Sequence, residues 1–129
     1  MLLDEPTSGL DSFTATNIAK CLQRLAYRRN KTIVSTIHQP NSQVYACCDR
    51  LILLADGHLM YQGPASQVGN YFNFASKYKS QRRNPCDFFT SEMSVSYPKT
   101  KEDEEKIAAY TQKYERELHP SVLKEMQEL

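Results

Sequence analysis

Residues 2–12, which read LLDEPTSGLDS, decide the fold of this chain. Leu2 and Leu3 form a short apolar run that indicates the end of a buried strand, and the carboxylates of Asp4 and Glu5 follow directly. Open α/β sheets bind their ligands beyond the carboxyl ends of their strands. A carboxylate at such an edge can hold Mg²⁺, and a second one can orient a water for attack on a phosphoryl group. An Asp-Glu pair taken alone is more often a solvated surface turn, so a metal-binding role of Asp4 and a catalytic role of Glu5 depend on the rest of the run.

The residues that follow predict a βαβ unit. Apolar residues recur at helical spacing in a helix that starts at Asp11 or Ser12 and ends at Arg29, with a capping residue before them. Residues 31–37 are rich in Thr, Ile and Val without clean alternation, which is typical of a strand covered on both sides. The strands on either side of the helix are therefore expected to be parallel neighbours with a right-handed crossover.

A second candidate segment, TIHQP at residues 36–40, lies at the end of the next predicted strand. Parallel neighbours end at the same edge of a sheet, so His38 is expected to lie near Asp4 and Glu5. An imidazole there can hydrogen-bond a phosphate and an attacking water. A lone histidine after a strand is more often structural, but the carboxylate pair at the neighbouring strand end favours a functional role. The two remaining histidines, His58 and His119, are interpreted as structural.

The remaining predicted elements are short. They are a helix over residues 42–48, a buried strand over 50–54, a return strand over 58–61 and an amphipathic helix over 68–75. Asp56-Gly57 is a hairpin turn signal, and Gly63-Pro64 ends the strand pair. Thr100 with Asp103 resembles a capping box that opens a further helix, and a final helix starts at Ser121. The basic residues between Lys77 and Arg83 are interpreted as a solvated face, with anionic lipid headgroups as the alternative.

Composition excludes several classes of protein. The 129 residues carry a formal net charge of +1, so no whole-chain field argues for nucleic acid, and we expect no nucleic-acid partner. The longest aliphatic run, Leu51 to Ala55, is far shorter than the roughly 20 residues of a membrane-spanning helix. The four cysteines lack metal-ligand spacing and are interpreted as reduced thiols of a cytosolic compartment.

The run at residues 2–12 resembles the Walker B motif and D-loop of ATP-binding cassette (ABC) ATPases, and His38 resembles their switch histidine, or H-loop. Further segments resemble the G subfamily, the White-type half-transporters, at residues 38–40, 49–57, 61–64 and 84–89. The last of these is similar to an Asn-Pro-Ala-Asp-Phe element of that subfamily, with Cys86 in place of Ala. The resemblance implies an α/β fold: a partial P-loop NTPase domain with parallel strands and flanking helices, followed by a mostly helical polar linker. Residues 1–93 are then expected to be the C-terminal half of a nucleotide-binding domain, and residues 94–129 a charged helical linker toward a transmembrane domain.

The same resemblance implies the roles of the site residues. ATP and Mg²⁺ are the implied cofactors: Asp4 organises the metal, Glu5 polarises water and His38 contacts the γ-phosphate. Further cofactor contacts are implied at Ser8, Gly9, Asp11 and Gln39, and the loop from Ser8 to Asp11 crosses to the partner domain. The implied partners are a second nucleotide-binding domain, in a homodimer or a heterodimer, and the transmembrane domain of the same polypeptide. The implied location is the cytoplasmic face of a membrane.

Two sequence features of ABC ATPases are missing from these 129 residues. No pair of the four glycines has the spacing of a phosphate-binding P-loop, and there is no Leu-Ser-Gly-Gly signature loop. We therefore expect the motor part of a transporter for export or for lipid, sterol or pigment substrates, inactive as an ATPase by itself. Two alternatives are a soluble ABC-type ATPase of DNA repair and a non-enzymatic, truncated remnant. The neutral charge and the segments at residues 49–57 and 84–89 argue against the first of these.

Overall fold

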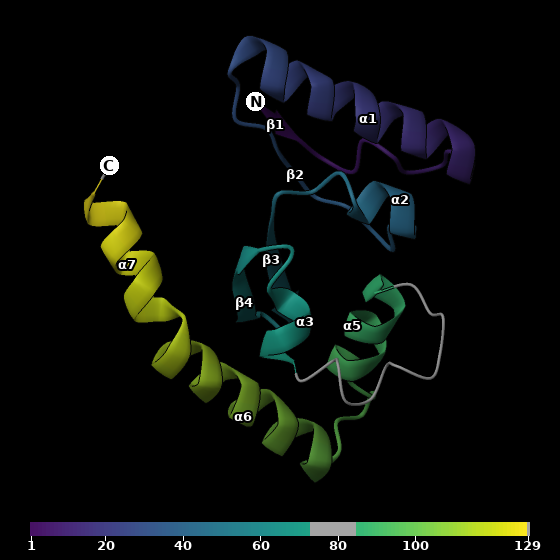
Figure 1. The fold of residues 1–129 in the computed structure, drawn as a ribbon. Coiled ribbons are helices and arrows are strands. Elements are labelled where there is room, and N and C mark those ends of the chain that lie inside the picture. The colour runs from purple at the N-terminus through teal and green to yellow at the C-terminus, as the bar shows by residue number, and fades with distance from the viewer. Residues whose placement is uncertain (73–84, 129) are drawn as a thin grey trace. The chain divides into compact units, whose positions relative to one another are not determined.

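The computed structural model describes residues 1–72 and 85–128 (Figure 1). The described chain divides into two compact units, each with its own set of contacts. The N-terminal unit comprises residues 1–48 with 85–88, and the hairpin unit comprises residues 49–72 with 89–128. Helix α5, Pro85–Met93, contributes its first turn to the N-terminal unit and its remaining residues to the hairpin unit.

Two parallel strands joined by a helix form the framework of the N-terminal unit. Strand β1, Leu2–Leu3, pairs with β2, Val34–Ser35, so that Leu2 lies opposite Val34 and Leu3 opposite Ser35. Helix α1, Ser12–Arg29, connects the two strands (Figure 1). The predicted βαβ unit is therefore confirmed in its element order and in the direction of its strands. The right-handed crossover stays a prediction.

Local geometry sets both ends of α1. Asp11 is the N-cap, and its Oδ1 accepts hydrogen bonds from the backbone N–H groups of Phe13 and Thr14, each at 3.0 Å. Asn30 ends the helix in the left-handed region, with φ 48°. The predicted end at Arg29 is confirmed, and of the two predicted starts the structure selects Ser12, with Asp11 as the cap.

Small side chains let α1 pack closely on the next helix, α2, Ser42–Tyr45. Ala15 and Ala19, each 8 % exposed, form a buried cluster with Val44 of α2. Asn41 caps α2 through its Oδ1, and its amide nitrogen also donates to α1. The helix predicted in this region is three residues longer than α2.

The β1–β2 sheet is more exposed than the sequence predicts. The strand expected over residues 31–37 has only two residues in the structure, and Val34 is 49 % exposed. Leu2 of β1 is 82 % exposed. The prediction of a strand covered on both sides is wrong for the described chain, in which this sheet has two strands. Apolar composition reports a tendency to be buried but does not specify which neighbours are present.

An antiparallel hairpin is the framework of the second unit. Strand β3, Arg50–Ala55, pairs with β4, His58–Pro64, with a register shift between Leu53 and Leu54. Asp56 and Gly57 join the strands with φ values of 50° and 77°. Type I′ turns require positive φ at both central residues, which explains this pair of residue types. The predicted hairpin turn is confirmed.

Only one face of the hairpin is covered. Met60 and Tyr61 of β4 are each 1 % exposed, whereas Ile52 and Leu54 of β3 are 58 % and 66 % exposed. The prediction that residues 50–54 form a buried strand is therefore wrong. Side chains alternate along β3 because an antiparallel pair packed on one side presents every second residue to solvent.

Helices of different length complete the hairpin unit. They are α3, Val68–Tyr71, α6, Lys101–Glu117, and α7, His119–Gln127. The amphipathic helix predicted over residues 68–75 is present as α3, and its positions 73–75 lie outside the described residues. The final helix starts two residues before the predicted Ser121, because Pro120 is compatible with a first helical turn.

The predicted capping box at α6 is confirmed. Oγ1 of Thr100 accepts a hydrogen bond from the backbone N–H of Asp103 at 3.2 Å, and Oδ2 of Asp103 accepts one from the backbone N–H of Thr100 at 3.2 Å. These hydrogen bonds lower the pKa of Asp103, with the backbone bond from Thr100 as the largest cause. Asp103 also accepts a hydrogen bond from the backbone N–H of Ser96. The carboxylate therefore connects the residues that precede α6 to the first turn of this helix.

Aromatic side chains fill the core of the hairpin unit. Phe72 contacts the rings of Phe89 and Tyr110, with centroid distances of 5.7 Å and 5.2 Å. Helix α6 contributes Ile107 and Tyr114, which are 8 % and 4 % exposed. The domain boundary predicted at residue 93 stays a prediction. Within the segment expected to be a linker, Ile107 and Tyr114 of α6 are buried in this core, whereas most of the other α6 residues are exposed.

Gly63 lies against a buried ring, which generates a stability prediction. A Cβ at position 63 would lie 2.9 Å from Oη of Tyr61, a hydroxyl that donates to the carbonyl oxygen of Pro64 at 2.7 Å. Gly63→Ala is therefore expected to lower the free energy of unfolding by roughly 1–3 kcal/mol, measured by urea denaturation of the full chain. Tyr61→Phe alone is expected to cost about 1 kcal/mol because it removes this hydrogen bond.

A double-mutant cycle separates the clash from a general effect of side-chain addition. The two costs are expected to sum to more than the cost of the double variant, because Tyr61→Phe removes the 2.9 Å contact. Gly57→Ala is the matched control: its Cβ would meet no atom within 4 Å, and its cost comes from the φ of 77°. Strict additivity of Gly63→Ala and Tyr61→Phe would contradict the predicted contact.

Candidate functional site

The candidate site lies at the carboxyl ends of β1 and β2 in the N-terminal unit. Asp4 follows Leu3, and Thr36 follows Ser35, the register partner of Leu3. The backbone N–H of Thr36 donates to the carbonyl oxygen of Leu3 at 3.1 Å, so the strands are still paired where they end. The parallel pairing therefore brings residues more than 30 positions apart in sequence to one edge.

The hydroxyl of Thr36 forms hydrogen bonds with both residues that follow β1. Oγ1 of Thr36 donates a hydrogen bond to Oδ1 of Asp4 at 2.6 Å and accepts one from the backbone N–H of Glu5 at 2.8 Å. A distance of 2.6 Å is typical of a hydroxyl bound to a charged carboxylate. Thr36 therefore fixes the orientation of the Asp4 carboxylate and the backbone at Glu5. Sequence reasoning quoted Thr36 within its segment but gave it no role, although its position at a strand end was a usable signal.

Glu5 has an unusual backbone conformation. Its φ is 41°, in the left-handed region that residues other than glycine rarely adopt and that is frequent at functional sites. The carbonyl oxygen of Glu5 accepts a hydrogen bond from the backbone N–H of Ser8 at 3.0 Å, so the chain turns sharply after the strand. The Glu5 side chain is exposed, and none of the hydrogen bonds among the described residues involves its carboxylate.

The loop from Ser8 to Asp11 leads into α1. Gly9 has a φ of 71° and a Cβ there would meet nothing within 4 Å, so backbone conformation and not space explains this glycine. Ser8 is exposed. The carboxylate of Asp11 is occupied by the helix cap, and its Oδ2 accepts a hydrogen bond from Oγ1 of Thr14 at 2.7 Å. This hydrogen bond is the largest cause of the lowered pKa of Asp11. The cofactor contacts expected from Ser8, Gly9 and Asp11 stay predictions.

His38 and Gln39 follow Thr36 at the same edge, and both side chains are exposed. Gln39 has a φ of 45°, so the chain bends where β2 ends. Across residues 1–72 and 85–128, no hydrogen bond or ion pair joins His38 to Asp4 or Glu5. The structure thus brings Asp4, Glu5 and Thr36 into contact, whereas the catalytic role of His38 and the cofactor contact of Gln39 stay predictions.

The side chains at this edge supply few metal ligands, so they fit a metal ion whose remaining ligands are water and phosphate. The described residues contain no group of three or more His, Cys, Asp and Glu side chains that could hold a metal ion. Mg²⁺ is usually bound by one or two carboxylates together with substrate phosphates and water. Oδ1 of Asp4 accepts from Thr36, and no described residue donates to Oδ2, so one carboxylate oxygen remains for such an ion.

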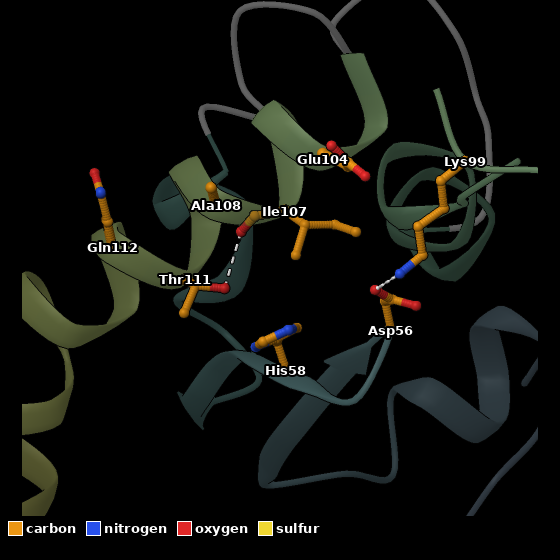
Figure 2. A pocket seen from close by; sticks show the side chains of 8 residues that line it. All are labelled: Asp56, His58, Lys99, Glu104, Ile107, Ala108, Thr111 and Gln112. Carbon is orange, nitrogen blue, oxygen red and sulfur yellow. Dashed lines mark hydrogen bonds and ion pairs between the residues drawn. The ribbon is translucent and has the colours of Figure 1, made fainter. Parts of the chain in front are cut away.

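A cavity of about 410 Å³ lies elsewhere, in the hairpin unit (Figure 2). Figure 2 shows Asp56 and His58 on the hairpin side and Ile107 and Thr111 on α6. Lys99 forms an ion pair with Asp56, which lowers the pKa of Asp56 and raises that of Lys99. None of the sequence-predicted site residues lines this cavity, and of its charged residues Lys99 and Asp56 are paired with each other.

Among the helices of the described residues, none is both long enough and apolar enough to cross a bilayer.

Comparisons with known proteins identify the family. The family model described as ABC-2 type transporter matches residues 38–114, which include His38 and Gln39. ABC transporter G family member 1 of Dictyostelium discoideum is 46 % identical over 89 residues, which are 69 % of this chain and 11 % of that protein. Protein white of Drosophila melanogaster is 34 % identical over 108 residues, which are 84 % of this chain and 16 % of that protein.

A third relative carries a more explicit name. The broad substrate specificity ATP-binding cassette transporter ABCG2 of Rattus norvegicus is 43 % identical over 89 residues, which are 69 % of this chain and 13 % of that protein. The chain thus spans less than a fifth of the length of each of these three relatives. Over more than half of its residues it matches one family, and the chain belongs to the ABC-2 type transporters, in their G subfamily.

Proposed function

We propose that this chain is part of the ATP-hydrolysing motor of a G-subfamily ABC transporter, with residues 1–93 as the C-terminal half of a P-loop NTPase domain. The contact that carries the proposal is the hydroxyl of Thr36, which joins Asp4 and Glu5 at the carboxyl edge of two parallel strands. Ligands of open α/β sheets bind at such an edge. The description of the matching family names transport, and ATP binding enters through the name of the rat relative.

Each residue of the edge has a separate task in this proposal. Asp4 would hold Mg²⁺ through the oxygen that Thr36 leaves free. Glu5, whose carboxylate is exposed, accepts a hydrogen bond from a water and aligns it. His38 donates a hydrogen bond from its imidazole to a phosphate oxygen. Bound ATP supplies the phosphoanhydride bond whose hydrolysis drives transport.

The loop between the strand and α1 supports an assembly with a second motor domain. Ser8 and Gly9 are exposed, and the positive φ of Gly9 directs the backbone away from β1. Ser8, Gly9 and Gln39 would contact the nucleotide, with Asp11 holding the loop as the cap of α1. The partners are then a second nucleotide-binding domain and a transmembrane domain, which places this chain at the cytoplasmic face of a membrane. The segment at residues 94–129 would lead toward that transmembrane domain.

The transporter is favoured over the ATPase of DNA repair by the relatives. Two of the three relatives described above are named as transporters, and the family description also names transport. The formal net charge of +1 adds no argument for nucleic acid.

The role of Glu5 is tested in a chimera. Residues 1–93 of this chain replace the corresponding segment of rat ABCG2, so that Glu5 is included, and ATP hydrolysis is measured. Glu5→Gln is expected to lower kcat by at least about 100-fold while nucleotide binding is retained, because Gln cannot act as a base. Asp49→Asn, which removes a carboxylate away from the strand edge, is the control and is expected to keep the activity. An unchanged kcat in Glu5→Gln would sink the proposal.

Thr36 is tested as a positioning residue in the same chimera. Thr36→Val preserves the shape of the side chain but removes both hydrogen bonds, to Asp4 and from Glu5. We expect at least about a tenfold loss in kcat and a higher Mg²⁺ concentration for half-maximal activity, because the carboxylate is no longer oriented. Thr36→Ser keeps the hydroxyl and should restore both values. Equal behaviour of the Val and Ser variants would show that the hydroxyl has no such role.

A further inference from the structure

A row of cations lies on the solvent side of α1. Lys20, Arg24 and Arg28 are spaced at i, i+4 and i+8, which places them one above the other on a single helix face. Arg29 follows in the last turn, and Lys31 lies just beyond the helix. All five side chains are exposed. We call Lys20, Arg24 and Arg28, together with the adjacent Lys31, the basic face of α1; Arg29 lies about half a turn around the helix from Lys20 and is not part of it.

The basic face lacks compensating acidic partners. Helix α1 contains no Asp or Glu, and across the described residues none of the five cations forms an ion pair. The guanidinium of Arg24 donates to the backbone carbonyl of Lys20 at 3.3 Å, which leaves its charge in place. Like charges at i, i+4 destabilise a helix. The pairs Lys20–Arg24 and Arg24–Arg28 therefore oppose the helix that carries them.

The helix dipole explains why Arg28 and Arg29 are favourable, but it does not explain Lys20 and Arg24. Cations are favourable in the last turn of a helix, where Arg28 and Arg29 lie, and the effect is lost beyond that turn. Lys20 and Arg24 lie before the last turn. Their repulsion has no compensation within the described chain, and an anionic surface outside the chain would provide it.

We propose that the basic face of α1 binds an anionic membrane surface through lipid headgroups such as phosphatidylserine. Clusters of four to eight Lys and Arg residues are attracted to anionic leaflets, and this face has four with Lys31 included. The distance from Lys20 to Arg28 along the helix is about 12 Å, so the charges form a straight row on an exposed side. Tyr27, three residues after Arg24, is 67 % exposed and offers an amphipathic ring beside the cations.

One observation favours a membrane over a nucleic acid. The family to which the chain belongs is one of transporters, so a bilayer is part of its surroundings. This proposal does not depend on the ATP site, because the residues at the strand edge take no part in it.

The experiment measures co-sedimentation of the full 129-residue chain with vesicles. Phosphatidylcholine vesicles are compared with vesicles that also contain about 30 % phosphatidylserine, at low salt and at about 0.5 M salt, where exposed charges are screened. We expect binding only to the anionic vesicles and loss of binding at high salt. The variant Lys20→Gln/Arg24→Gln/Lys31→Gln should lower the partition coefficient by about 100-fold, at about fivefold per charge.

Two control variants separate the basic face from other cations. Lys101→Gln/Arg116→Gln/Lys124→Gln removes the same charge from α6 and α7 and should keep most of the binding. Neutralising the basic residues between Lys77 and Arg83 tests the other basic segment, which lies outside the described residues, and should also leave binding to the basic face. The α1 variant should keep its helical circular dichroism and unfold at the same or a higher temperature, because like-charge repulsion is removed.

Each outcome of this experiment either supports or overturns the proposal. Anionic-lipid binding that is lost in the α1 variant and retained in both controls supports the proposal. It is overturned by binding that the α1 variant keeps, by an equal loss in either control, by an absence of binding to phosphatidylserine vesicles, or by tighter binding of a DNA duplex than of the vesicles.

Discussion

The hydroxyl of Thr36 is the contact on which the proposed site depends. It is shared between the carboxylate of Asp4 and the backbone of Glu5, so it connects the ends of two strands that are each only two residues long. Such short strands have few ladder hydrogen bonds, and a side-chain bridge at their ends adds to the pairing. The same bridge orients one carboxylate and holds the next residue at a positive φ. The Thr36 hydroxyl therefore both supports the pairing of the two strands and orients the residues of the proposed site.

The hairpin unit is held together in a different way. Its core consists of aromatic rings around Tyr61 and Phe72, to which α6 contributes Ile107 and Tyr114. Lys113 of α6 donates to the backbone carbonyl of Tyr71 and lies 4.4 Å from the centre of its ring. A segment that is polar by composition can thus be anchored by a few apolar positions at helical spacing. Most of the charged residues of α6 remain in solvent, so the polar composition of this segment does not indicate how it packs.

In the N-terminal unit, acidic residues lie before α1 and basic residues lie toward its C-terminal end. Acidic side chains gather before the helix, with Asp4 and Glu5 at the strand edge and Asp11 at the cap. Cations occur from Lys20, at the middle of the helix, to its last turn, and at Lys31, two residues beyond its end. Each end suits a ligand of the opposite sign: a metal bound to phosphates at the acidic end and, in our proposal, lipid headgroups at the basic face. A single helix would then serve two sites without changing shape.

The sequence by itself determined the features that depend on neighbouring residues. The bounds of α1, the turn at Asp56-Gly57 and the capping box of Thr100 were predictable because cap and turn geometry involves only a few adjacent positions. Only the tertiary structure decided that Thr36 joins Asp4 and Glu5, since that contact spans 32 positions and requires the strand register. It also decided that Val34 and the outer face of β3 are exposed, because burial depends on which layers surround a strand and not on the strand's own composition.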